Sequence, residues 1–547
     1  MEMSGIKRFF ASAFLLTVSA LIMRSISVSF SAYVSNTAGA EAMGVFSQIM
    51  SVFGFALTIA TSGVNLAVTR MVSEALAQND DGLVRKSMKK SIAYCLFFSI
   101  LSGSLLFIFS EPIGAKVLKD ERTIFSLKIL SLSLPFISLT SALGGYFTAV
   151  RRVYKSTAYS VAEQLIKIFF TVKMFELYIH RGIEYACIAL VSADAISEFS
   201  AFAMSASMYL LDRKKHIKRK ATAVSDSVVS KKLCKIALPI AASTYIRSGL
   251  ITIEHILIPK SLIKSGLSRS AALASYGMLH SMVMPVVLFP TAVLSSFSGL
   301  LVPELAEAAV KGKKGAVQNI AERAFQYSLL FSFCISGILI CFSGEFGIII
   351  YDSLEASRFI KIMAPLVPVM YLDSVTDAML KGLDKQIYSM NVNIIDALLS
   401  IILVAVLLPK YGIMGYVMTI YATELVNASL SVAKLIEVSE MRAKIFKWVF
   451  SPLISVIGAT TLGRIIFSAF ELPLGMISEL VLNCVMVVLL YCLLIQITGA
   501  FTKRDKVWLK NAIGIRQFSA DRCGTRRDAR KHSAPLQKEP LKNIQKY

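Results

Sequence analysis

Apolar runs of about 20 residues recur along almost the whole chain, and they are the feature that most limits its fold. A run of that length crosses the hydrocarbon core of a bilayer as one α-helix, with its backbone polar groups paired inside the helix. Of the 547 residues, 55% are hydrophobic, which is more than a soluble core requires. We therefore expect an all-α integral membrane protein with about fourteen transmembrane helices, near residues 9–34, 42–67, 91–110, 124–150, 157–179, 185–211, 234–259, 272–302, 319–343, 359–380, 387–408, 413–435, 448–468 and 474–498.

The net charge of +23 follows the topology of these spans and does not indicate nucleic-acid binding. Alternate connections between the spans carry roughly three times as many Lys and Arg residues as the others, and the positive-inside rule places the richer side in the cytoplasm. With an even number of spans, both termini are then cytoplasmic. The basic tail at 499–547 is expected to be disordered and attracted to anionic membrane lipids, with protein or nucleic-acid docking as the alternative.

An arginine interrupts two of the apolar runs. Arg24 lies in the first expected span, and Arg247 lies 223 residues later in the seventh. An arginine at the centre of a bilayer costs roughly 2.5 kcal/mol or more, so such residues usually face a water-filled cavity or a partner. The pair predicts a positively charged central cavity that suits an anionic cargo. The alternative is that each arginine neutralises an acid on a neighbouring helix, for which Glu254, two turns from Arg247, is available.

Weak internal similarity indicates that the chain is duplicated. Four residue pairs share one offset of 233, namely Gly44/Gly277, Thr58/Thr291, Ser62/Ser295 and Glu74/Glu307. Both halves start on the same side of the membrane, so the repeats are parallel, and a cleft between two such lobes can open to either side by rocking. We expect an N-lobe at 1–211 (spans 1–6), a basic cytoplasmic linker at 212–233, a C-lobe at 234–440 (spans 7–12), and spans 13–14 at 441–498.

Several stretches resemble a known family. They are 61–63 (TSG), 236–240 (IALPI), 258–268 (IPKSLIKSGLS), 301–303 (LVP) with Glu307, and 381–385 (KGLDK). They are similar to stage V sporulation protein B-like members of the polysaccharide-biosynthesis branch of the multidrug/oligosaccharidyl-lipid/polysaccharide (MOP) exporter superfamily. The similarity covers about residues 5–498, and its motifs are loose patterns that say more about the superfamily than about the substrate.

The resemblance implies two six-helix lobes around a V-shaped cavity in a bacterial plasma membrane. It implies flipping of a polyprenyl-pyrophosphate-linked sugar or peptidoglycan precursor, with a polymerase or glycosyltransferase as a conceivable partner. Because relatives include ion-coupled drug exporters, a cation-coupled multidrug exporter is the alternative. A guanidinium grips the oxygens of a pyrophosphate with paired donors, so Arg24 and Arg247 are the first candidates for cargo binding.

Two further basic residues lie in the fifth span. Lys167 is one turn from Glu163, in the order that favours pairing, and Lys173 lies further along. Both are candidates for lining the cavity, and structural pairing is the alternative. In the sixth span Asp194 and Glu198 are one turn apart, so either one carboxyl stays protonated or the pair borrows a cation such as Lys167.

A second group of buried polar residues is acidic and lies in the second half. The candidates for coupling transport to Na⁺ or H⁺ are Asp396, Glu424, Asn427, Asp373, Asp377 and Glu254, because hard cations prefer oxygen ligands. Asp373, Asp377, Asp396 and Glu424 depart from the family pattern, in which neutral or amide residues are commoner. For some of them a position in water at the cytoplasmic rim is the alternative.

The sequence does not predict an enzyme. It has no long loop with paired catalytic carboxylates, no metal-spaced histidines and no G-x-S-x-G or phosphate-binding glycine motif. We expect no cofactor beyond the possible coupling cation, and no bound metal other than a monovalent one. His255 and His280, in the seventh and eighth spans, are expected to make helix–helix contacts.

Overall fold

The computed structural model describes residues 2–216, 224–442, 444–469 and 475–501, and these ranges contain helices and turns but no strand. The helices of the first half are α1 (Glu2–Thr61), α2 (Val64–Ala77), α3 (Asp81–Ile108), α4 (Ser110–Pro112), the π-helix η1 (Ile113–Leu118), the 3₁₀ turn η2 (Glu121–Thr123), α5 (Ile124–Ala149), α6 (Val153–Tyr178), the 3₁₀ turn η3 (Ile179–Arg181) and α7 (Ile183–His216).

The second half continues with α8 (Asp226–Lys264), α9 (Arg269–Gly277), the π-helix η4 (Met278–Val283), α10 (Met284–Leu288), α11 (Thr291–Val310), α12 (Lys314–Cys341), α13 (Ser343–Tyr351), α14 (Leu354–Met363), the 3₁₀ turn η5 (Ala364–Leu366), α15 (Val367–Gly382), α16 (Gln386–Tyr411), α17 (Ile413–Ser439), the π-helix η6 (Phe446–Phe450), α18 (Ser451–Ala469) and α19 (Met476–Ile497). Part of the predicted linker and nearly all of the predicted basic tail lie outside the described residues.

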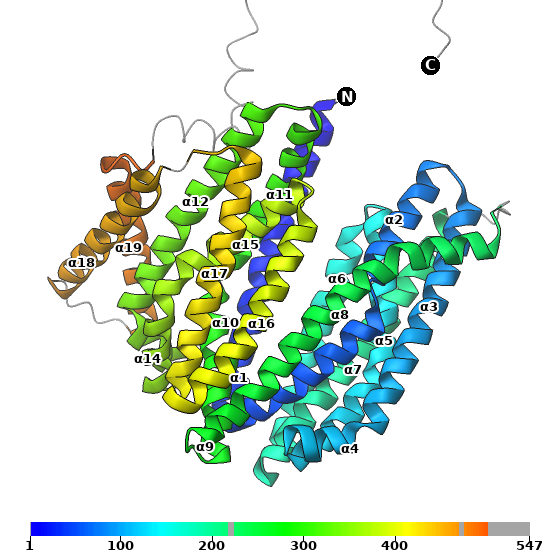
Figure 1. The fold of residues 1–547 in the computed structure, drawn as a ribbon, viewed down its shortest axis with the longest axis horizontal. Coiled ribbons are helices and arrows are strands. Elements are labelled where there is room, and N and C mark those ends of the chain that lie inside the picture. Colours follow the sequence, from blue (N-terminus) through cyan, green and yellow to red (C-terminus); the bar gives the residue numbers. More distant parts are fainter. Residues whose placement is uncertain (1, 217–223, 443, 470–474, 502–547) are drawn as a thin grey trace, which may run out of the picture.

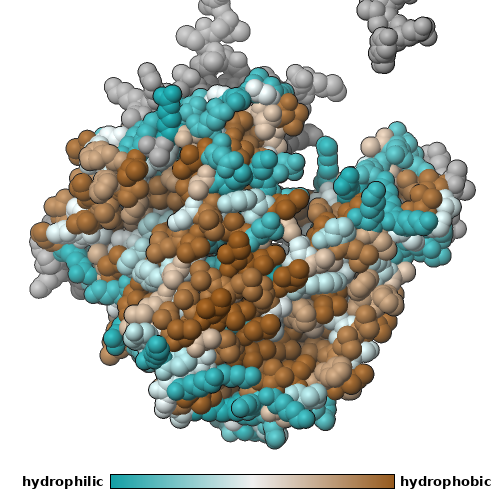
Figure 2. All heavy atoms as spheres, in the orientation of Figure 1, coloured by the Kyte–Doolittle hydropathy of each residue, from teal (hydrophilic) through white to brown (hydrophobic). Residues whose placement is uncertain are grey.

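The predicted membrane fold is confirmed. Eleven helical segments in the described ranges are long and apolar enough to cross a membrane, by length and composition. Figure 2 shows a broad apolar band between hydrophilic ends, as a bilayer requires. The number fourteen stays a prediction. Helix α6 is not one of the eleven, and it carries five charged residues along its length, Lys155, Glu163, Lys167, Lys173 and Glu176.

A glycine divides the first of these segments into two. Ile22–Ala77 is 56 residues long, far longer than the roughly 20 residues that cross a bilayer. Within it, Gly39 has φ 84° and ψ 164°, and a residue without Cβ reaches such a conformation at little cost. The chain reverses there, so α1 crosses twice, as the spans predicted near 9–34 and 42–67 require.

The molecule has the shape of a V, open at the end where the N-terminus lies (Figure 1). We call α2–α7 the first lobe, α9–α19 the second lobe, and the end near α4, α9 and α14 the closed end. Figure 2 shows a notch between the lobes at the open end. The two halves of α1 contact different lobes. Asn36, before the kink, donates to the carbonyl of Ile350 at 2.9 Å, whereas Ser102 of α3 donates to the carbonyl of Ala56, after it, at 2.6 Å.

Helix α8 also lies between the lobes. It packs against α16 of the second lobe and against α1, α2 and α3 on the other side. Because α1 and α8 are the first helices of the two predicted repeats, the helices that carry Arg24 and Arg247 both run along the inside of the V (Figure 1).

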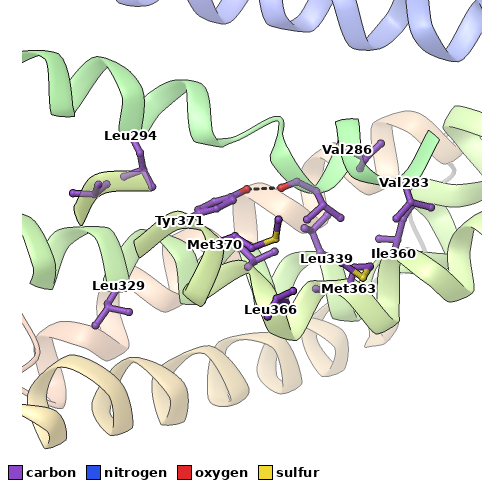
Figure 3. Close-up of a cluster of buried hydrophobic side chains, with 14 of the residues drawn as sticks. Val283, Val286, Leu294, Leu329, Leu339, Ile360, Met363, Leu366, Met370 and Tyr371 are labelled. Carbon is purple, nitrogen blue, oxygen red and sulfur yellow. Dashed lines mark hydrogen bonds between the residues drawn. The ribbon is translucent and has the colours of Figure 1, made fainter. Parts of the chain in front are cut away.

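The core of the second lobe fixes the position of α15. Tyr371 is fully buried, and its hydroxyl donates to the carbonyl of Val287 in α10 at 2.6 Å (Figure 3). Around it pack apolar side chains from η4 to α15, including Val283, Val286, Leu294, Leu329, Leu339, Ile360, Met363, Leu366 and Met370. A buried hydroxyl that lost this acceptor would be left unpaired, so the bond ties α15 to the short helix α10.

Candidate functional site

A cavity of about 500 Å³ lies between the lobes, between the two halves of α1 and the helices α8, η4 and α10. Its lining combines hydroxyls, two imidazoles and apolar groups: Ser31, Met43, Phe46, Ser47, Met50, Ser51, Gly54, Ser248, Ile251, Thr252, His255, His280, Ser281 and Pro285. Since such hydroxyls can hydrogen-bond to water or to a ligand, the inside of the V is partly polar at this depth.

Hydroxyl contacts join the two chain halves beside this cavity. Ser31 donates to the carbonyl of Ser281 at 3.2 Å, and the hydroxyls of Ser47 and Ser281 are in contact. Along α8, Thr252 donates to the carbonyl of Ser51 at 3.0 Å, and Thr58 donates to the hydroxyl of Ser248 at 3.0 Å. Each of these is a single neutral hydrogen bond, worth about 1 kcal/mol. These hydrogen bonds can therefore be exchanged for bonds to water at little cost during a conformational change.

Both arginines lie on the side of this cavity that faces the open end. Arg247 directly precedes the lining residue Ser248, and Arg24 precedes the lining residue Ser31 by seven residues, or about 10 Å of helix. Arg247 is exposed and Arg24 is half-buried. Both also act electrostatically on α15, Arg24 on Tyr371 and Arg247 on Asp373. The structure thus brings the two predicted arginines to one region of the V.

Neither arginine is neutralised by a direct ion pair within the described part of the chain. The Nε atom of Arg24 is buried without a hydrogen-bond partner there. Glu254 and Arg247 form no ion pair in the described chain, and Oε1 of Glu254 accepts a hydrogen bond from Ser400 at 2.6 Å. Arg247 acts on Asp396 and Asp373, but neither carboxylate is within ion-pair distance of it. Both guanidinium groups therefore keep donors available for an anion.

Four acidic candidates gather where α8, α15, α16 and α17 face one another. Asp373 and Asp396 act electrostatically on Glu424, and Asp396 acts on Glu254. One oxygen each of Asp373 and Asp396 is buried without a hydrogen-bond partner in the described chain. All four carboxylates are partly buried. We call Glu254, Asp373, Asp396 and Glu424 the second-lobe acidic cluster.

The two remaining coupling candidates have other partners. Asp377 pairs with Lys381 at 2.6 Å and accepts a hydrogen bond from Ser389. Asn427 is buried, and its Oδ1 accepts a hydrogen bond from Ser431 at 3.5 Å. Asp377 thus lies at the edge of the cluster with a cation of its own. The roles of all six candidates in ion coupling stay predictions.

In the first lobe the basic candidates are paired. Lys167 forms an ion pair with Asp194 of α7 and not with Glu163, its neighbour one turn away on α6. Both members of this pair act electrostatically on Glu163 and Glu198, and Glu163 also acts on Glu198. We call Glu163, Lys167, Asp194 and Glu198 the first-lobe cluster. Lys173 is exposed and pairs with Glu176 at 2.9 Å. Neither lysine lines the interlobe cavity, and their contact with cargo stays a prediction.

The two histidines lie in the cavity wall and contact each other, as expected for a helix–helix contact. His255 Nδ1 lies 2.6 Å from the hydroxyl of Tyr276, and the ring of His280 stacks on Tyr276. The serines and threonines of the cavity were not among the residues predicted from the sequence. Their recurrence inside apolar runs, as in Ser47 and Ser51, was the signal available.

Two family models match the chain. One, described as polysaccharide biosynthesis protein, matches residues 9–309, and the other, described as MatE, matches residues 261–406. The chain is 26% identical over 428 residues to stage V sporulation protein B of Bacillus subtilis (strain 168), covering 77% of this chain and 82% of that protein. It is 22% identical over 414 residues to the lipid II flippase MurJ of the same organism, covering 71% and 75%.

Solved structures share the fold. A structure of the lipid II flippase MurJ in an inward closed conformation has a TM-score of 0.64 and 15% identity, covering 91% of this chain and 99% of that one. An inward-facing multidrug resistance MATE family transporter of the MOP superfamily has a TM-score of 0.60 and 11% identity, covering 78% and 99%. At such identities the likeness establishes the fold alone.

Proposed function

Because the chain belongs to the polysaccharide biosynthesis protein family, in the branch of the MOP superfamily that contains stage V sporulation protein B, we propose that it flips a lipid-linked glycan. The cargo would be an oligosaccharide or peptidoglycan precursor on a polyprenyl pyrophosphate. It would cross the bacterial plasma membrane by alternating access of the V. The protein performs no covalent chemistry in this proposal.

The observation that carries the proposal is the pair of arginines without ion pairs beside the interlobe cavity. A pyrophosphate carries two or more negative charges on closely spaced oxygens, which paired guanidinium donors match. The cavity next to the arginines has hydroxyl and imidazole groups that suit a sugar, while the prenyl chain can stay in lipid. The excess of basic residues in alternate connections supports a cytoplasmic open end, where such cargo would enter.

The proposal is tested by removing the two charges while keeping hydrogen-bonding capacity. We expect Arg24→Gln and Arg247→Gln each to slow flipping of a defined lipid-linked sugar in proteoliposomes about 10- to 100-fold, because a hydrogen bond to a charged group contributes about 1.5–3 kcal/mol. Arg181→Gln is the matched control, since that arginine is an exposed residue of η3 that stacks over two tyrosine rings. Wild-type flipping by the Arg24→Gln/Arg247→Gln double variant would contradict the proposal.

A coupling ion is the second part of the proposal. The second-lobe acidic cluster supplies four carboxylates, with Asn427 on the same face of α17 as Glu424, and these suit Na⁺ or H⁺. Binding of either would offset the repulsion among the carboxylates. Asp396 and Glu424 are the central members of the cluster, because Asp396 acts electrostatically on the other three carboxylates and Glu424 is acted on by two of them. A polymerase or glycosyltransferase partner stays a prediction.

A cation-coupled multidrug exporter is the alternative, and the same acidic cluster together with the MatE match favours it. The two functions differ in what neutralising the arginines does. For a cationic drug the two guanidinium groups are repulsive, so Arg24→Gln/Arg247→Gln should leave export unchanged or faster. Drug resistance on expression, without flipping of lipid-linked sugars in proteoliposomes, would favour the alternative.

A further inference from the structure

We propose that four charged residues at the closed end, Glu41, Asp120, Arg122 and Arg269, form a latch that holds the lobes in the arrangement of Figure 1. The latch lies at the opposite end of the V from the entrance to the interlobe cavity. The latch itself does not depend on the proposed function. Only its consequence for transport rests on that function, because opening the closed end would be the step that releases cargo on the far side of the membrane.

The first part of the latch lies within the first half of the chain. Arg122 donates two hydrogen bonds to the carboxylate of Asp120, at 2.9 Å and 2.8 Å. Its third donor reaches Glu41, two residues after the kink in α1, at 3.0 Å. The Asp120 side chain is 4% exposed, so its charge depends on these donors. Arg122 thereby fixes two carboxylates that both face the start of α9.

The second part crosses to the second lobe. Nη2 of Arg269, the first residue of α9, lies 3.2 Å from Asp120 and donates to the carbonyl of Leu118 at 3.3 Å. The hydroxyl of Ser270 donates to the carboxylate of Glu41. If the lobes separated here, Arg269 and Ser270 would leave with α9, while Arg122 would still neutralise both carboxylates. Because no buried charge would be left unpaired, the latch can open and reclose.

The latch lies beside a close backbone contact. A Cβ on Gly277 would come within 2.4 Å of the amide nitrogen of Gly44, and a Cβ on Gly44 within 2.0 Å of the carbonyl oxygen of Leu273. Backbones this close need residues without side chains. These glycines are one of the repeat-related pairs, so the two copies of the repeat touch here. The charged residues hold this contact together at its solvent side.

Protonation is not expected to release the latch near neutral pH. Burial would raise the pKa of Asp120, but the hydrogen bonds and charge of Arg122 and the charge of Arg269 lower that pKa below its ordinary value. A carboxylate with a depressed pKa keeps its stabilising contacts at every pH above that value and loses them only as the pH falls through it. The latch should therefore hold equally well between about pH 6 and pH 8.

The test is the double variant Arg269→Gln/Ser270→Ala, which removes the contacts between lobes and leaves Arg122 on its carboxylates. Hydrogen exchange of the purified full chain in lipid nanodiscs, without cargo, should rise at the closed end, in α9 and in α1 near residues 39–48. Exchange should fall in α8 near Arg247, because the open end closes as the other opens. We expect the ratio of the two arrangements to shift about three- to tenfold.

Two controls make the result decisive. Arg358→Gln removes an exposed arginine of α14 and should leave exchange unchanged, whereas Arg269→Lys, which keeps the charge, should restore most of the wild-type pattern. Faster exchange at both ends would mean loosened packing and would overturn the proposal, as would no change at α9. A reciprocal shift in a protein that fails to flip lipid-linked sugars would support the latch and contradict the proposed cargo.

Discussion

The two lobes have carboxylates at matching positions of their helices, but the charges of these carboxylates are neutralised in different ways. Glu163 of α6 and Asp396 of α16 are 233 residues apart, the offset of the repeat. Asp194 of α7 and Glu424 of α17 are 230 apart, as are the glycines that precede these helices, Gly182 and Gly412. Each lobe thus has carboxylates at matching positions of its fifth and sixth spans.

The difference lies one turn further along the fifth span. There the first lobe has Lys167, which pairs with Asp194, and the second lobe has Ser400, which donates to Glu254. In the described chain, the cation that acts electrostatically on the second-lobe acidic cluster is Arg247 of α8. Its guanidinium group is not within ion-pair distance of the carboxylates of Asp373 or Asp396. The first lobe therefore contains its own counter-ion, whereas the second lobe has no lysine at the matching position. The comparison predicts a structural role for the first-lobe cluster and an ion-coupling role for the second-lobe acidic cluster.

The largest effect should come from removing the counter-ion of the first lobe. Lys167→Met leaves Asp194 buried without its partner, and breaking a buried ion pair costs about 3 kcal/mol or more. We expect a much lower midpoint of thermal unfolding in detergent. Adding Asp194→Asn should recover most of the loss, because the carboxylate that Lys167 neutralised is then uncharged as well. A single variant as stable as wild type would remove the basis of the comparison.

A cation should stabilise the second lobe and not the first. We expect Na⁺, titrated against choline at constant ionic strength, to raise the thermal midpoint of the wild type. Saturating binding contributes about 2–3 kcal/mol at 100 times the dissociation constant. Asp396→Asn and Glu424→Gln should abolish the rise, and the repeat-related Glu163→Gln should keep it. If Glu163→Gln were the one variant that abolished the rise in the thermal midpoint, the cation would bind in the first lobe, and the roles assigned to the two lobes would be reversed.

Placing the lysine of the first lobe at the matching position of the second lobe should weaken the stabilisation by sodium. Ser400→Lys places an ammonium group on α16 at the position that Lys167 occupies on α6, so it should remove at least half of the sodium-dependent rise. Ser400→Ala, which removes the hydrogen bond to Glu254 without adding charge, should retain the rise. If both variants lost the sodium-dependent rise equally, sodium binding would depend on the hydroxyl of Ser400 and not on the absence of a lysine at this position.

The smallest effect is expected at the surface of the first lobe. Lys173 and Glu176 are both more than half exposed, and such pairs contribute about 0.5 kcal/mol or less. Lys173→Gln should therefore leave the unfolding midpoint and the flipping rate of the reconstituted protein unchanged. A clear loss of flipping in this variant would mean that the cargo contacts α6 and would bring the first lobe into the transport path.

The features that a sequence shows best here are those that depend on periodicity and on symmetry. The apolar runs predicted the helices, and the shared offset identified Gly44 and Gly277 before the structure showed their backbones in contact. Arg24 and Arg247 were found because a charge in an apolar run needs a special environment. Such signals are local, so a single chain is enough to read them.

Partners between helices could not be read in this way. On α6 the spacing favours pairing of Lys167 with Glu163, yet the packing of α6 on α7 gives it Asp194. Arg122 and Arg269 lie 147 residues apart in short connections, where charged residues are ordinary, so nothing in the sequence marked them. Which charges meet depends on how the lobes dock, and local spacing does not contain that information.

If the lobes rock, the contact between Gly44 and Gly277 near one tip of the molecule would act as the fulcrum. Arg24 lies 15 residues before the kink at Gly39, or roughly 22 Å of helix, so a tilt of about 10° about the glycines would move it by roughly 4 Å. The same tilt hardly displaces atoms at the fulcrum itself. Because this pivot lies so close to the closed end, a small tilt of the lobes would widen the open end for bulky head groups of different sizes. The closed end would stay sealed during that tilt.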